Sequence, residues 1–230
     1  EAPDTLPTTP PALFIPMMRG EVRADAVNLT NATDAPVTLS LKVSGLPDEM
    51  IADTVSLREV LFTDTHAHHP IAAALPEAVR SGAGWRVTIP AGTTKQIWLS
   101  LQRPSSTTKA GRYEGVMTAS AGGDLAAVLL PVVVQLFDMD FPAQPTLALG
   151  GWDYTNGDAA YYRAPGNLAS LLNLFRDHHV NAPWATSAVV PQGMHFDDQG
   201  GLTNADALNF RAWDAWVERW SFAREYCIFL

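Results

Sequence analysis

The pattern of the sequence changes at the stretch Phe141-Pro-Ala-Gln-Pro145. Two prolines within five residues favour a stiff, extended linker. Upstream of it, short segments alternate between apolar and polar residues, whereas downstream of it strand-like segments alternate with helical ones. We therefore expect three parts: a flexible segment over residues 1–20, a β-sandwich over residues 21–140, and an α/β unit over residues 141–230.

The upstream part carries the signature of antiparallel strands with one buried face. The clearest example is Val37-Thr-Leu-Ser-Leu-Lys-Val43, in which the apolar residues occupy every second position. Similar segments run over residues 56–62, 85–89 and 96–101, and Pro90-Ala-Gly-Thr-Thr94 supplies a turn between two of them. About seven strands at this spacing predict an immunoglobulin-like antiparallel β-sandwich.

The downstream part predicts parallel strands joined by right-handed crossovers. Strands are expected over residues 146–152, 180–184 and 225–230, with an irregular excursion over 188–203. Helices are expected from Leu168 to His179, after an Asn167 cap, and from Thr203 or Asn204 to Trp220. Three parallel strands alone would leave apolar sheet faces open, so we expect either a chain that continues past Leu230 or a sheet that the sandwich shields.

Composition narrows the function and the location. A net charge of −9 and a pI near 5.0 leave little basic surface for phosphates, so we expect no nucleic-acid partner. The longest apolar run, residues 126–137, is too short to span a membrane and reads as a buried strand. The single Cys227 excludes an internal disulfide and is expected to pack as a small hydrophobe. The proline-rich start, Glu1 to Pro11, is typical of a mature exported protein, so an extracytoplasmic location is expected, with a trimmed chain as the alternative.

Two stretches resemble known proteins. Residues 90–118, Pro-Ala-Gly-Thr-Thr-Lys-Gln-Ile-Trp through Gly-Arg-Tyr-Glu-Gly-Val-Met-Thr, resemble the closing strands of immunoglobulin-like accessory domains in secreted bacterial proteins. Residues 142–184, with Leu-Ala-Leu-Gly-Gly-Trp-Asp-Tyr and Leu-Phe-Arg-Asp-His-His-Val-Asn-Ala-Pro-Trp, resemble the start of the catalytic barrel in exported glycoside-hydrolase-like proteins of the family-123 hexosaminidase-like group. This resemblance implies a multi-domain β plus α/β protein whose (β/α)8 barrel is incomplete. It also implies that the catalytic carboxylates come from a later barrel strand, so this chain should be inert alone and its status as an enzyme stays open.

A glycan site is expected at the carboxyl ends of the barrel strands, where such barrels have their active sites. Trp152, Asp153 and Tyr154 are expected after the first strand, and Asn181 to Trp184 after the second. Aromatic rings stack on sugars while carboxylates and amides bind hydroxyl groups, so a glycan or oligosaccharide is the expected partner. Plain packing of these tryptophans is the alternative. A non-enzymatic extracellular carbohydrate-binding or adhesion module is the rival function, and interdomain or self-association through an uncovered sheet is a third.

The sequence has two clusters of polar residues that could bind a metal or act in catalysis, and it lacks several common motifs. His66, His68 and His69 could ligate a metal, but a polar loop or an interdomain contact explains them as well. Asp197 and Asp198 are adjacent carboxylates in a Gly-rich loop, where bonding to their own backbone is expected. The sequence contains no phosphate-binding loop, nucleophile elbow or paired zinc-ligand motif. We therefore expect no cofactor and no metal.

Overall fold

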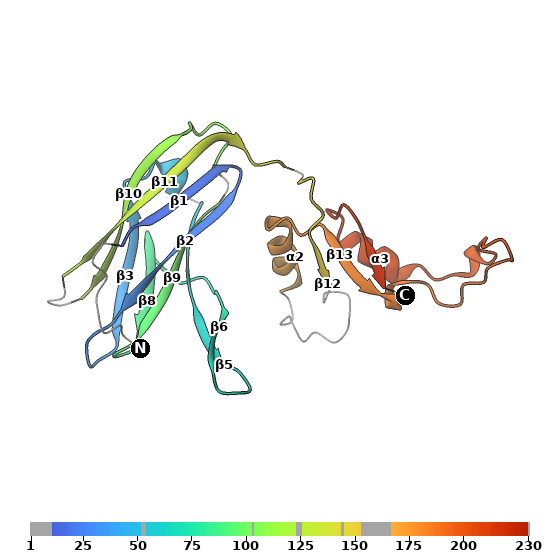
Figure 1. The fold of residues 1–230 in the computed structure, drawn as a ribbon, viewed down its shortest axis with the longest axis horizontal. Coiled ribbons are helices and arrows are strands. Elements are labelled where there is room, and N and C mark those ends of the chain that lie inside the picture. Colours follow the sequence, from blue (N-terminus) through green and yellow to red (C-terminus); the bar gives the residue numbers. More distant parts are fainter. Residues whose placement is uncertain are drawn as a thin grey trace. The chain divides into compact units, whose positions relative to one another are not determined.

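The computed structural model describes residues 11–51, 54–102, 104–122, 126–143, 145–152 and 167–229. The chain divides into two compact units between Pro142 and Ala143, and each is described by itself (Figure 1). The division falls inside the proline-bearing stretch at which the sequence pattern changes. Among the described residues, no helix is both long enough and apolar enough to cross a membrane.

The first unit consists of strands and one short helix. A six-stranded sheet has the order β1-β11-β10-β3-β8-β7, a three-stranded sheet has the order β2-β9-β4, and β5 and β6 form a separate hairpin. The elements are β1 (Leu13–Arg19), β2 (Val22–Thr30), β3 (Val37–Ser44), α1 (Asp48–Ile51), β4 (Val55–Glu59), β5 (Leu61–Asp64), β6 (Pro70–Ala74), β7 (Val79–Ser81), β8 (Gly84–Ile89), β9 (Thr94–Gln102), β10 (Gly111–Ala121) and β11 (Val128–Asp140).

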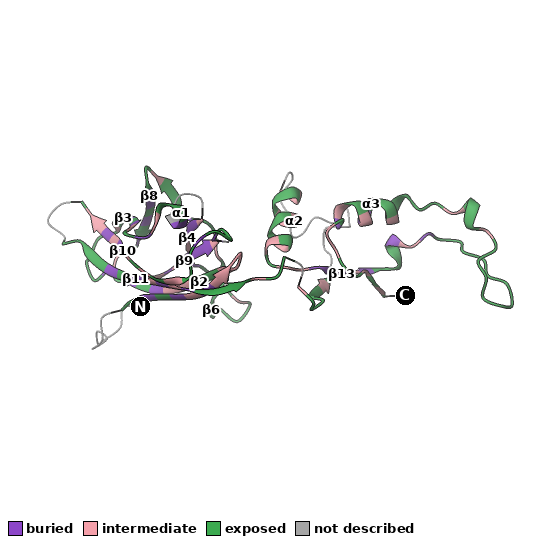
Figure 2. Ribbon diagram, turned by 90° about the horizontal axis from the view of Figure 1, so that it is seen from above, coloured by how far each residue is buried: buried purple, intermediate pink, exposed green. Residues whose placement is uncertain are grey.

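The core of this unit lies between the two larger sheets, because alternate residues of each strand turn inward. Leu41 and Val43 of β3 are buried from one sheet, and Ile97, Leu99 and Leu101 of β9 are buried from the other. Burial alternates along β3 and over the first part of β9, and Figure 2 shows the buried residues within the sandwich. The strands expected from alternation over residues 37–43, 85–89 and 96–101 are therefore confirmed.

The expectation of a flexible segment over residues 1–20 is wrong for residues 13–19. These residues form β1, which pairs in parallel with β11 and buries Leu13, Ile15 and Met17. The sequence does not reveal this strand because its partner lies far along the chain. Two carboxylates that come later in the chain accept hydrogen bonds from backbone N–H groups of β1. Phe14 N–H donates to Asp25 Oδ2 at 2.8 Å, and Met18 N–H donates to Glu21 Oε2 at 2.8 Å.

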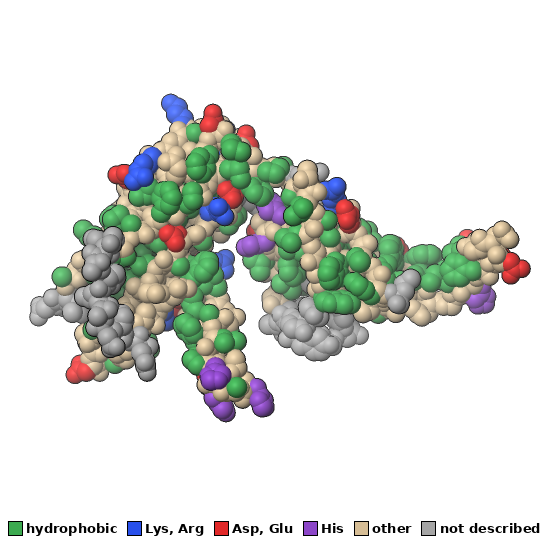
Figure 3. Space-filling model, in the orientation of Figure 1, with side chains coloured by type: hydrophobic (Ala, Val, Ile, Leu, Met, Phe, Trp, Pro, Cys, Tyr) green, Lys and Arg blue, Asp and Glu red, His purple; other side chains and the backbone are tan. Residues whose placement is uncertain are grey.

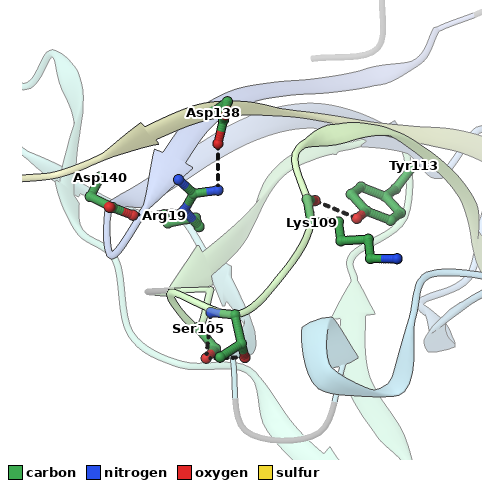
Figure 4. Close-up of polar contacts among 7 residues, drawn as sticks. Arg19, Ser105, Lys109, Tyr113, Asp138 and Asp140 are labelled. Carbon is green, nitrogen blue, oxygen red and sulfur yellow. Dashed lines mark hydrogen bonds and ion pairs between the residues drawn. The ribbon is translucent and has the colours of Figure 1, made fainter.

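Two polar contacts secure the corners of the sandwich (Figure 4). The Tyr113 hydroxyl donates to the Lys109 carbonyl four residues upstream, which is the arrangement called a tyrosine corner in immunoglobulin-like domains. Arg19 donates to Asp138 at 2.9 Å and to Asp140 at 2.7 Å, and these two hydrogen bonds raise its pKa. Arg19 thus joins the end of β1 to the end of β11, immediately before the linker.

The second unit is an open parallel sheet with helices on one face. Its elements are β12 (Gly150–Trp152), α2 (Leu168–Asp177), β13 (Ala182–Thr186), the 3-10 turns η1 (Ser187–Val189) and η2 (Ala205–Ala207), α3 (Arg211–Arg219) and β14 (Cys227–Phe229). The strands pair in the order β12-β13-β14, both pairs parallel, as the sequence predicts. Within the described residues the sheet does not close into a barrel.

A small aromatic core holds the helices against the sheet. Trp216 of α3 and Trp220, the residue that caps its end, are buried in one cluster with Ala185 of β13, and Ile228 of β14 packs against that cluster. Phe175 of α2 stacks on Trp220, with ring centroids 5.3 Å apart. The helices therefore cover one face of the sheet only (Figure 2).

Several boundaries in this unit differ from those expected. The first strand begins at Gly150 rather than at Thr146, and the last helix begins at Arg211 rather than at Thr203 or Asn204. The Asn209 side chain accepts the Arg211 N–H at 3.0 Å and so starts the helix late. Cys227 is exposed, not packed, because the next residue, Ile228, is the one that faces the helices.

Candidate functional site

The face of the parallel sheet opposite the helices carries three aromatic rings. Trp152 pairs in register with Trp184, and Phe229 lies opposite Thr186 in the next strand. The ring centroids of Trp152 and Phe229 are 4.8 Å apart, those of Trp184 and Phe229 are 5.6 Å apart, and the Trp152 and Trp184 rings meet edge to face at 6.2 Å. We call Trp152, Trp184 and Phe229 the aromatic face.

These rings are open to solvent although they contact one another. Trp152 is 44% exposed and Phe229 is 46% exposed, whereas Trp216 on the helix side is 0% exposed. Phe229 pairs with Thr186, the last residue of β13, and Trp152 pairs with Trp184 two residues earlier, so the aromatic face lies toward the carboxyl end of β13. Ligands of α/β proteins bind at the carboxyl ends of parallel strands.

A glycine gives the Trp184 ring its place. A Cβ atom added at Gly150 would lie 2.6 Å from Trp184 Nε1 and 2.3 Å from the Ala182 carbonyl oxygen. Both distances are too short for any side chain, so only glycine allows the indole to lie across β12. The pair Gly150-Gly151, too weak a signal to indicate a nucleotide site, therefore has a packing role at its first residue.

Asn181 is not where the sequence places it. β13 begins at Ala182, so Asn181 precedes the strand at its amino end, and the expectation that it follows the second strand is wrong. Its side chain is buried and engaged with the backbone before β12: it accepts the Leu149 N–H at 2.8 Å and donates to the Leu147 carbonyl at 3.3 Å. Its own carbonyl accepts from Arg224 N–H before β14. Asn181 therefore ties the three strands together, and its buried side chain is directed to the backbone before β12.

The other predicted site residues divide in two. Trp152 and Trp184 come together on one face, but Trp184 lies within β13 and not after it, where the sequence placed it. Asp153 and Tyr154 lie outside the described residues. Sequence reasoning missed Phe229, although the alternation of Ile228 toward the helices would have placed its neighbours Cys227 and Phe229 on the opposite face.

The polar clusters have structural explanations. The three histidines occupy the tip of the β5–β6 hairpin, where Thr65 Oγ1 accepts the His69 N–H at 3.0 Å (Figure 3). Asp197 Oδ1 accepts the backbone N–H groups of Gln199 at 2.9 Å and Gly201 at 2.7 Å, so this carboxylate bonds to its own loop as the sequence indicates. Within the part of the chain that the structure describes, no three acidic, His or Cys side chains gather as a metal site would require.

Behind the sheet, Tyr226 secures the start of β14. Its hydroxyl donates to the Trp220 carbonyl at 2.8 Å, at the end of α3. Burial raises the pKa of this hydroxyl above its ordinary value. The contact fixes the helix end against the strand that carries Phe229.

Comparison with known proteins gives a likeness of fold. No family model matches the sequence, and no curated protein matches it. Among solved structures, a family 123 glycoside hydrolase from Clostridium perfringens, studied for glycolipid glycan hydrolysis, is similar with a TM-score of 0.62 at 13% identity. The similarity covers 91% of this chain and 41% of that one, so the chain spans less than half the length of the hydrolase.

Two further likenesses concern smaller parts. A FixG-related protein from Vibrio parahaemolyticus matches over 50% of this chain and 78% of its own, with a TM-score of 0.32 at 10% identity. The PapD-like domain of human CEP192 matches over 61% of this chain and 94% of its own, with a TM-score of 0.33 at 10% identity. Both TM-scores are too low to indicate a shared fold. The hydrolase match covers 91% of this chain, so the likeness of fold includes residues of both units.

Proposed function

We propose that this chain is the N-terminal portion of an exported carbohydrate-active enzyme of the glycoside hydrolase type. In this proposal the β-sandwich is an accessory domain, and β12, β13 and β14 are the first three strands of the catalytic barrel. The observation that carries it is the aromatic face, three rings at an open parallel sheet that the described helices leave uncovered. The likeness of fold to a family 123 glycoside hydrolase supports the same reading.

The chemistry assigned to the aromatic face is the positioning of a sugar. The C–H groups on one side of a sugar ring stack on an aromatic surface, and Trp152 offers the most exposed indole of the face. Asp153 and Tyr154, which follow Trp152 in the sequence, would supply hydrogen bonds to hydroxyl groups. Glycoside hydrolysis further needs carboxyl groups held across the scissile bond, and the resemblance assigns them to a later strand. The chain as given therefore orients the sugar and leaves the bond intact.

The exposure of each ring assigns it a different task. Trp152 is 44% exposed, whereas Trp184, its partner in register, is only partly exposed and packs against Gly150. We assign the direct contact with sugar to Trp152 and the support of its ring to Trp184 and Phe229.

The proposal is tested with a chain that extends past Leu230 by the remainder of its reading frame. We expect it to hydrolyse at least one member of a panel of aryl glycosides. Trp152→Ala should then raise KM about tenfold with a smaller effect on kcat, because the contact is made in both ground and transition states. Phe210→Ala, an exposed aromatic residue at the start of α3, is the matched control and should leave both constants unchanged.

Two results would contradict the proposal of a glycoside hydrolase. One is a reading frame that stops at Leu230, and the other is an extended chain that hydrolyses no glycoside in the panel. Glycan binding by the 230-residue chain in that case would favour the non-enzymatic carbohydrate-binding or adhesion module instead.

A further inference from the structure

The sandwich has a groove on the outer face of its three-stranded sheet. Ile97, Leu99 and Leu101 of β9 point into the core, so Gln96 and Trp98 point outward. Together with residues of the β5–β6 hairpin and on either side of it, they line an open groove of about 230 Å³, which we call the sandwich groove. It is lined by Val60, Ala72, Ala73, Ala74, Leu75, Gln96 and Trp98.

Trp98 is fixed in the groove by a chain of amides. Its indole Nε1 donates to Gln96 Oε1 at 2.9 Å, and Gln96 Nε2 donates to Asn28 Oδ1 at 3.2 Å. The residue beside Trp98 on β2 is Ala26, which is too small to cover the ring. The indole is therefore held in one orientation and half-buried, with polar amide groups at one end.

The hairpin supplies the opposite wall. Arg58, beside Trp98 on β4, donates from Nη1 to the Leu75 carbonyl at 3.2 Å and so ties the base of the hairpin to the sheet. Beyond that base, the hairpin stands out from the sandwich as a separate finger (Figure 3). The three alanines of this wall leave the groove open, since any larger side chain would fill it.

The chemistry of the groove selects its ligand. None of its seven lining residues is charged, and Arg58, which lies beside Trp98 on β4, is bonded to the Leu75 carbonyl at 3.2 Å. The volume is below the ~300–1,000 Å³ typical of sites for drug-sized molecules, so it suits a single ring. A ring with an apolar side for Trp98 and hydroxyl groups for the amides is a neutral sugar.

The geometry points to the sandwich groove as a binding site for one neutral sugar residue, with Trp98 as the stacking platform and the Gln96 amide, held by Asn28, as its polar partner. This site is separate from the aromatic face of the second unit and goes beyond the proposed hydrolase function. It gives the accessory domain a role of its own, which is to hold a glycan.

The test uses the 230-residue chain with 15N-labelled tryptophan, in which each indole N–H gives its own NMR signal. Methyl glycosides of glucose, galactose and N-acetylgalactosamine are added to millimolar concentration, with sorbitol as the control solute. We expect the Trp98 signal, identified by its loss in Trp98→Ala, to shift saturably with at least one glycoside and not with sorbitol. The signals of Trp152 and Trp184 report on the other site in the same spectra, so failure of one proposal is distinguished from failure of the other.

Two variants complete the design. Ala74→Gln narrows the groove from its hairpin wall and should weaken the saturable shift at least tenfold, without contact with the core. Phe62→Ala removes an exposed aromatic residue, 59% exposed, from the same hairpin but outside the groove, and should leave the shift unchanged. A Trp98 signal that moves with none of the glycosides, or equally with sorbitol, overturns the site. So does a loss of the shift in Phe62→Ala that matches the loss in Ala74→Gln.

Discussion

Replacing Asn181 by alanine separates a structural residue from a sugar-binding one. The change removes the acceptor of the Leu149 N–H at 2.8 Å and the donor to the Leu147 carbonyl at 3.3 Å. Each such hydrogen bond contributes about 0.5–1.5 kcal/mol net, and a buried polar group left without a partner costs about 1–3 kcal/mol. Because Leu149 itself is 48% exposed, water can bind its N–H group and replace part of the lost hydrogen bonding. We therefore expect the free energy of unfolding of the second unit to fall by about 2 kcal/mol.

Tryptophan fluorescence during urea unfolding measures this change. Five of the seven tryptophans lie in the second unit, namely Trp152, Trp184, Trp213, Trp216 and Trp220, so the signal mainly follows that unit. Asn181→Asp, which keeps the acceptor and loses the donor, should fall between Asn181→Ala and the wild type. Asn173→Ala, on the exposed side of α2, is the control and should change stability by less than ~0.5 kcal/mol. An Asn181→Ala chain that unfolds like the wild type but binds glycan more weakly would refute the structural role.

Three further outcomes follow from single contacts. Gly150→Ala should destabilise the second unit by about 2–3 kcal/mol in the same urea experiment, whereas Gly151→Ala, whose added Cβ meets nothing within 4 Å, should be tolerated. The tyrosinate absorbance of Tyr226 should appear at a higher pH than that of a free tyrosine, since burial raises its pKa. As pH rises, the hydroxyl of Tyr226 loses its proton in the unfolded chain before it does so in the folded protein. The contribution of Tyr226 to stability is therefore complete below pH ~10 and declines as pH rises through the folded pKa. Tyr226→Phe should abolish the part of the stability loss at high pH that this hydroxyl causes. Asp25→Ala frees the Phe14 N–H at the edge of β1 and should increase self-association in sedimentation experiments, whereas Asp25→Asn, which keeps an acceptor, should not.

The strands of the sandwich could be predicted wherever one face of a strand is buried and the other is polar. Val37 to Val43 shows this pattern, because one face of β3 packs in the core between the two sheets while the other is exposed. β1 could not be predicted in the same way. It contains Pro16, and its pairing with β11 depends on a contact between the two ends of the unit. Local alternation therefore identifies strands, while the closing of the sandwich depends on pairing that alternation does not encode.

The candidate site was predictable in part for the same reason. Trp152 and Trp184 follow from the order of strands and helices, since consecutive parallel strands lie side by side. Asn181 was misplaced because the segment 181–184 was assigned to the carboxyl end of its strand, whereas β13 begins at Ala182 and Asn181 precedes it. The start of α3 moved for a related reason, since Asn209 rather than Asn204 provides the bond that begins the helix.

Five of the seven tryptophans fall into two groups, and the residue beside each ring explains which. Trp85, Trp216 and Trp220 are at most 2% exposed and lie among large apolar side chains, so their rings contribute stability through burial. Trp98 and Trp184 lie on the sheet faces opposite the cores, each beside a residue with little or no side chain. Ala26 is next to Trp98, and Gly150 contacts Trp184. At Trp98 the small neighbour leaves the ring accessible, and at Trp184 it lets the ring support Trp152 from the next strand. The same kind of neighbour on two different sheets is the physical reason for proposing a sugar on each of these sheet faces.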